Sequence, residues 1–195
     1  MATYHAIAAM EQAVLGLLAE ACPRAEFVGA RFEAYQAANF RQPMDEGVAL
    51  YVHRVGANPT RRNPPPRKTV DGRVYKQSLP LDVHFLMIPW SKSTARQHMM
   101  LGWLMRVLED NASLGGGFIN RFSAVPNTFE DGDSVEIVLD PMAVQDMLAV
   151  WEVAKPNIQI SASYVARFLP IDSEVLLPDP GPPVQSRTFV TGALR

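Results

Sequence analysis

A proline- and arginine-rich segment between two strand-like stretches constrains the fold of this 195-residue chain most. Residues 48–55 and 79–88 are rich in β-branched and aromatic side chains, which favours strands. Residues 56–77 between them hold Asn-Pro, Pro-Pro-Pro and Asp-Gly turn signals, and proline cannot donate to a sheet. A loop of about 20 residues inside a compact domain is normally functional or disordered. The sequence therefore predicts a hairpin whose two strands are joined by a long arm.

This arm is strongly cationic, whereas the whole chain has a net charge of −2. Residues 54–76 carry seven basic residues and one acid, a charge of +6, and the remainder, with 11 basic and 19 acidic residues, carries −8. Surfaces of opposite charge dock against each other, so we predict an interaction role for the basic residues. They are Arg54, Arg61, Arg62, Arg67, Lys68, Arg73 and Lys76.

Two other interpretations of the arm stay open. The first is a solvated loop whose charges confer solubility. The second is phosphate binding with Tyr75 as a stacking residue, although the near-neutral net charge argues against a general nucleic-acid binder. Trp90 follows a proline at the end of a predicted strand, and we expect it to be an exposed anchor at an interface.

Apolar residues at helical spacing predict three helices. The first ends before Pro23, the second is capped by Ser91 or Ser93 and runs to about Asn111, and the third begins at Asp140-Pro141. Their predicted apolar faces are Ile7, Met10, Val14, Leu17, Leu18 and Ala21; His98, Leu101, Met105 and Leu108; and Val144, Met147, Leu148 and Trp151. Trp103 and Trp151 are expected in the core.

Alternation with period two predicts further strands at residues 27–35, 135–139 and 158–168. The fold class is therefore α+β, with a single mixed sheet, two to three packed helices, the long basic hairpin arm and an extended C-terminal tail. We assign residues 1–169 to one domain, with the arm at 56–77. Residues 170–195 form the tail, because five of the 16 prolines lie between positions 170 and 183.

Catalytic and ligand-binding motifs are missing from the sequence. There is no nucleotide-binding glycine loop, no nucleophile elbow and no paired-histidine zinc motif, and Gly115–Gly117 is expected to be a flexible turn. His53 and His84 are predicted cross-strand neighbours, but Cys22 is the only thiol and a structural zinc needs four ligands. We predict no catalytic residue, metal or cofactor, while an enzyme on an α+β scaffold stays a third alternative.

Compartment signals are equally sparse. No apolar run approaches the about 18 residues of a membrane-spanning helix, and residues 1–20 lack a basic leader pattern. A single cysteine cannot form an internal disulfide. We therefore expect synthesis in the cytoplasm and no membrane partner.

An ordered set of motifs covering roughly residues 3–174 resembles the tail-terminator (cap) proteins of contractile injection systems. These are phage-tail-like particles typified by the antifeeding prophage and the virulence-cassette complexes. The N-P-T-R-R-N-P-P passage and the S-Y-V-A-R strand are the most specific. The matching segments are residues 4–9, 50–55, 58–65, 79–86, 135–142, Trp151, 160–167 and 171–174.

The resemblance implies a structural role without a catalytic site. Such caps form a six-fold ring on the distal end of the inner tube and the sheath, and they stop polymerisation of both. The implied partners are five further copies of the chain in a homohexamer, the inner tube protein and the sheath protein, with no nucleic acid and no cofactor. A nucleic-acid-binding adaptor that uses the basic arm is the alternative function. The sequence leaves open whether the particle stays in the cell or is released.

Overall fold

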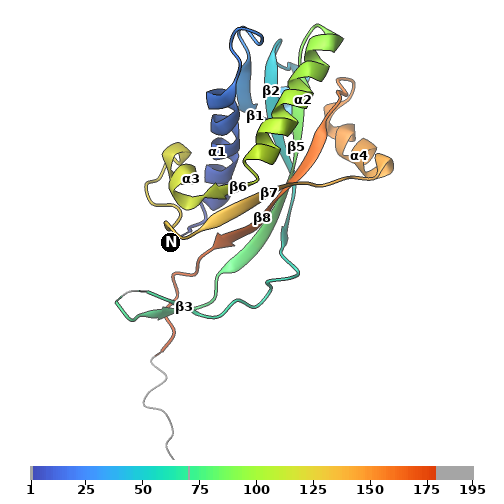
Figure 1. The fold of residues 1–195 in the computed structure, drawn as a ribbon. Helices are drawn as coiled ribbons and strands as arrows, with labels where there is room; N and C mark the ends of the chain where they lie inside the picture. Colours follow the sequence, from blue (N-terminus) through green and yellow to red (C-terminus); the bar gives the residue numbers. More distant parts are fainter. Residues whose placement is uncertain (1, 70, 179–195) are drawn as a thin grey trace, which may run out of the picture.

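A computed structural model describes residues 2–69 and 71–178 of the chain, in which six strands form one mixed sheet of order β1-β2-β5-β8-β7-β6 (Figure 1). Antiparallel pairing joins β2 (Gly47–Ala57), β5 (Leu79–Trp90) and β8 (Ala162–Ile171) at the centre. β1 (Arg31–Ala34) is parallel to β2 at one edge, and β7 (Ser134–Leu139) and β6 (Ser113–Gly115) form the other. The predicted α+β class, the mixed sheet and the β2–β5 hairpin are confirmed.

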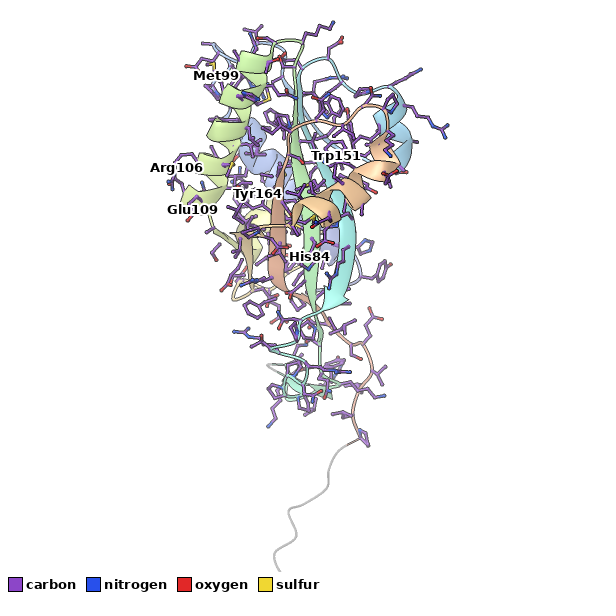
Figure 2. The ribbon with its side chains drawn as sticks, turned by 90° about the vertical axis from the view of Figure 1, so that its right-hand side faces the viewer. His84, Met99, Arg106, Glu109, Trp151 and Tyr164 are labelled. Carbon is purple, nitrogen blue, oxygen red and sulfur yellow. The ribbon has the colours of Figure 1, made fainter. Side chains whose placement is uncertain are left out.

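Helices cover both faces of this sheet (Figures 1 and 2). α1 (Ala6–Ala21), α2 (Thr94–Asp110) and the short α3 (Gly116–Phe122) lie on one face. α4 (Val144–Trp151) and the turns η1 (Ala37–Arg41) and η2 (Glu152–Ala154) lie on the other. The described residues thus hold four α-helices, one more than the sequence predicted.

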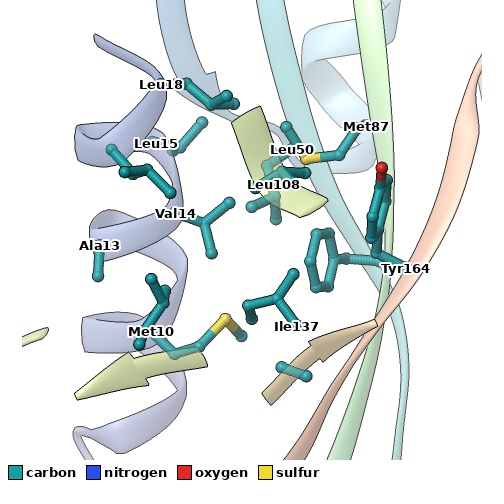
Figure 3. Close-up of a cluster of buried hydrophobic side chains, with 14 of the residues drawn as sticks. Met10, Ala13, Val14, Leu15, Leu18, Leu50, Met87, Leu108, Ile137 and Tyr164 are labelled. Atoms are coloured by element: carbon teal, nitrogen blue, oxygen red, sulfur yellow. The ribbon is translucent and has the colours of Figure 1, made fainter. Parts of the chain in front are cut away.

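Strand β5 explains why the sheet is covered on both sides. Val83, Phe85 and Met87 are fully buried in the main core, which Figure 3 shows between α1 and the sheet. Leu86 and Ile88, which alternate with them, are buried in a second core beneath α4. Because successive strand residues point to opposite faces, the continuous apolar run of residues 85–90 in β5 requires two apolar layers.

The second helix begins where it was predicted to begin, but the face that it buries differs from the predicted one. Ser93 is the N-cap of α2, and its hydroxyl accepts a hydrogen bond from the Arg96 backbone amide. The buried stripe is Gln97, Met100, Leu104 and Leu108, so the predicted inward position of His98 is wrong. Gln97 tolerates burial because its amide donates to the Pro89 carbonyl at 2.9 Å.

Two predicted strands have different limits. The segment 27–35 is extended only at Arg31–Ala34, and Val28 lies exposed in a turn beside Gly29, whose φ is +78°. The segment 158–168 begins its strand only at Ala162, which leaves Ile158 and Ile160 exposed.

The glycine run is not a flexible turn, which corrects the sequence analysis. Gly115 ends β6 and Gly116 begins α3 directly. A Cβ on Gly116 would lie 2.1 Å from the Glu130 carbonyl oxygen, so close backbone approach requires glycine there.

The start of α4 was also predicted wrongly. The helix begins at Val144 with Ala143 as N-cap, because Asp140 is not available as a cap. Its carboxylate instead bonds the ring of His84 on β5. Of the predicted inward face, Trp151 is buried and Met147 partly so, whereas Val144 and Leu148 are exposed.

No helix among the described residues is long and apolar enough to cross a membrane. The division between a domain at 1–169 and a tail at 170–195 stays a prediction. β8 runs through Pro170 to Ile171, and residues 179–195 of the tail lie outside the described residues.

Candidate interaction surface

The basic arm leaves the sheet between β2 and β5 and projects beyond it (Figure 1). Asn58 fixes its first turn, because its side-chain amide donates to both carboxylate oxygens of Asp82 at 2.8 and 3.0 Å. The Asn58 side-chain oxygen in turn accepts from the backbone amides of Thr60 and Arg61. Asn58 is buried, so the sheet determines the direction in which the arm leaves.

The outer part of the arm forms a small sheet with the C-terminal segment. β3 (Arg67–Lys68) pairs with β4 (Val74–Tyr75) in an antiparallel hairpin. On the other side of β4, the backbone amide of Lys76 donates to the Val175 carbonyl at 2.9 Å, and the backbone amide of Leu177 donates to the Val74 carbonyl at 2.8 Å. We call β3, β4 and residues 175–177 together the arm–tail layer. The start of the predicted tail therefore holds the arm in place.

Asp172 joins this layer to the body of the protein. Its carboxylate accepts from the backbone amide of Ala2 at 2.9 Å and from the Ser78 hydroxyl at 2.5 Å. The same carboxylate lies 3.5 Å from the guanidinium of Arg67, which also pairs with Glu130. The N-terminus, the base of the arm and the tail thus meet at one buried carboxylate.

The seven predicted cations consequently differ in their surroundings. Arg67 is largely buried between Glu130, Asp172 and the ring of Tyr75, so its charge is used within the chain. Arg61 is exposed but stacks over the Phe168 ring at 4.3 Å. The remaining five are exposed, namely Arg54, Arg62, Lys68, Arg73 and Lys76. Long-range folding places acids of the body against the arm, which the charge count along the sequence did not indicate.

Trp90 is not the exposed anchor that its position suggested. It is 5% exposed in the second core, where its ring lies 6.3 Å from that of Tyr35. β5 continues through Pro89 to Trp90, and η1 and α4 cover that face of the sheet. Burial therefore removes Trp90 from the candidate interaction surface.

A cavity of about 390 Å³ lies between β2, β5 and α4, and sequence reasoning found it only in part. His53 and His84 are neighbours as predicted, with ring centroids 6.3 Å apart. His84 Nδ1 lies 2.8 Å from the Asp140 carboxylate, and Figure 2 shows His84 below α4. Arg54 and Asp146 complete its charged lining.

The electrostatics of this cavity centre on His53. Burial, followed by the charges of His84 and Arg54, lowers the pKa of His53, and Asp140 opposes this shift. The Nε2 atom of His53 is buried and has no hydrogen-bond partner among the described residues.

The cavity offers little for catalysis. The residues that line it include no Ser, Thr, Cys, Lys or Tyr for an imidazole to activate. Within the described part of the chain, no group of three His, Cys, Asp or Glu residues is arranged to hold a metal ion.

Residues 10–186 match the Pvc16 N-terminal domain family, and the chain belongs to that family. This assignment confirms the resemblance to tail terminators that the sequence motifs indicated.

Two solved structures share the fold. One is the PVC sheath/tube terminator of an extracellular contractile injection system in its extended state. It is 14% identical to this chain, with a TM-score of 0.62, and the match covers 97% of this chain and 65% of that protein. The other is the tube-terminating cap of the anti-feeding prophage, with 14% identity and a TM-score of 0.55 over 91% of this chain and 60% of that one. The chain thus spans less than two thirds of the length of either protein. No curated protein sequence matches it significantly.

Proposed function

We propose that this chain is a structural, non-enzymatic cap of a contractile injection system. The observation that carries the proposal is its family membership, together with a fold shared over nearly its whole length with two proteins described as terminators. In this role the chain binds the distal ends of the inner tube and the sheath and stops further addition of subunits. The particle is assembled in the cytoplasm.

The proposed assembly is a ring of six copies. A closed ring needs a heterologous interface, in which each copy offers two different complementary surfaces. The arm–tail layer is suited to be one of them, because it projects from the body with exposed cations, namely Lys68 in β3 and Arg73 and Lys76 on either side of β4. The Asp172 contacts fix the layer before binding, which lowers the entropy lost on association.

Tube growth in the presence of the chain tests this function. We expect substoichiometric amounts of the chain to shorten tubes assembled from purified tube protein, with label at one end of each tube. Replacing Arg62, Lys68, Arg73 and Lys76 together by Gln should weaken capping at least about tenfold, whereas Arg67 is left intact because it stabilises the fold. A matched variant with four exposed cations neutralised outside the arm, Arg31, Lys92, Arg106 and Arg121, should cap like the wild type. Tubes of unchanged length and unlabelled ends would contradict the proposal.

Nucleic-acid binding is the second function that the exposed cations favour. It predicts affinity that falls with salt, with a slope of about −0.9 per neutralised phosphate in a logarithmic plot. Tyr75, the residue expected to stack on a base, lies beneath Arg67 with 5.4 Å between guanidinium and ring centroid. We therefore expect no retention of duplex or single-stranded DNA at low salt. Salt-dependent retention that the fourfold arm variant abolishes would favour the adaptor.

A further inference from the structure

The cavity beneath α4 combines one buried polar atom that the fold does not satisfy with two exposed charged side chains. The buried His53 Nε2 lacks a partner among the described residues, and a buried unpaired polar atom costs about 1–3 kcal/mol. Neither Asp146 nor Arg54, which line the same cavity, forms an ion pair within the described part of the chain. A group that carries both charges would complement this lining.

The cavity is open because of how the chain enters α4. Asp140 is held by His84, so residues 140–143 cross the sheet as an irregular segment and the helix begins only at Val144. The side chains of α4 that turn toward the cavity include Asp146 and the small Ala149. A volume of about 390 Å³ is enough for one or two side chains of a protein partner, and too small for a folded element.

The tip of the arm carries the matching pair of charges. Asp71 and Arg73 form an exposed ion pair at 3.1 Å, and the Thr69 amide donates to the Arg73 carbonyl to close the turn. In its own chain the arm–tail layer holds the tip beyond the end of the sheet and apart from α4 (Figure 1). The Asp71 and Arg73 side chains are exposed there, where another molecule can contact them.

We propose that the cavity beneath α4 receives the tip of the basic arm from a second copy of this chain, with Arg73 facing Asp146 and Asp71 facing Arg54. This inference rests on the proposed function and names the two surfaces that meet between neighbouring copies. Because the donor and the acceptor are different surfaces, the contact is heterologous and propagates around a ring. Pairs of both signs fix the orientation of the neighbour more strictly than a single charge does.

A charge exchange tests the contact with the full chain. Asp146→Arg and Arg73→Asp should each weaken self-association at least about tenfold, whether it is measured alone or on tube and sheath ends. The double variant should return to within about threefold of the wild type, because the two charges are then exchanged across the contact. Glu26→Arg, a reversal of an exposed acid away from both surfaces, should have no effect.

The outcomes separate this inference from the cap function. Association that persists in both single variants, or that the double variant fails to restore, overturns the contact and leaves the cap intact. A wild-type chain that stays monomeric both alone and on tube and sheath ends overturns the cap and the contact together. Circular dichroism of each variant verifies that the fold is unchanged, as expected for side chains at the surface.

Discussion

Replacing Asp172 by Ala should destabilise the protein and release the arm. The carboxylate, whose side chain is 7% exposed, accepts hydrogen bonds from the Ala2 amide and the Ser78 hydroxyl and lies beside Arg67. A hydrogen bond to a charged group contributes about 1.5–3 kcal/mol. Water that enters the space left by the removed side chain would recover part of this. We therefore expect a loss of about 3 kcal/mol in the free energy of unfolding.

Urea denaturation measures this loss. With a slope of about 2 kcal/mol per molar, the midpoint should fall by about 1–2 M. Hydrogen exchange should also become faster at the amides of Lys76 and Leu177, which bond across the arm–tail layer. Glu174→Ala, an exposed acid two residues along the tail, is the control and should change neither readout. An unchanged midpoint with unchanged exchange in the Asp172 variant would refute the role of this carboxylate.

Three further predictions concern stability. Gly47→Ala should lower the free energy of unfolding by about 3 kcal/mol, because Gly47 has a φ of +144° and a Cβ there would lie 2.1 Å from the Arg31 carbonyl oxygen. A melting temperature equal to that of the wild type would contradict this. Burial raises the pKa of Tyr164 from 10.0 to about 12, so the native state holds the phenol proton more tightly than the unfolded state does. The free energy of unfolding should therefore fall by about 3 kcal/mol as the pH rises from 10.0 to about 12. Tyr164→Phe should remove this loss. The lowered pKa of His53 means that the unfolded state binds a proton more readily, so stability should fall as the pH drops below about 6.5. His53→Gln should reduce this fall when the urea midpoint is measured against pH. An unchanged fall would assign it to other groups.

Local patterns in the sequence predicted the elements whose partners are close along the chain. The stripe predicted for α1 corresponds to its buried face at Met10, Val14, Leu17 and Leu18, because it depends on helix geometry and one apolar layer, although its last member, Ala21, is exposed. The Ser93 cap was found for the same reason, since a hydroxyl three residues before an amide forms a local bond.

The errors arise where a distant residue decides the outcome. Asp140 has the sequence pattern of a helix cap, yet its carboxylate bonds His84, 56 positions away in the sequence. α4 therefore begins only at Val144. Trp90 was expected to be exposed at the end of its strand, because nothing nearby in the sequence indicated that η1 and α4 cover it. The sequence did contain a signal for this cover. Leu86 and Ile88 alternate with Phe85 and Met87 in β5, so they lie on the other face of the sheet and need a second core.

The candidate interaction surface could be predicted only in part for a related reason. The clustering of basic residues correctly located a projecting arm, because charge and proline content are local properties. The pairing of Val74 and Lys76 with residues 175–177, and the burial of Arg67 against Asp172, depend on contacts about 100 residues apart. No pattern in a single sequence encodes such pairs directly.

The solution mass of the full chain, measured by light scattering alone and then with purified tube protein, tests the central claim most directly. A cap that closes a ring predicts a species of six copies of the 21.6 kDa chain, about 130 kDa, in at least one of the two conditions. The tube-bound species should also contain six copies per tube end. A chain that remains at 21.6 kDa in both conditions, with no material at tube ends, would contradict the assignment as a ring-forming cap.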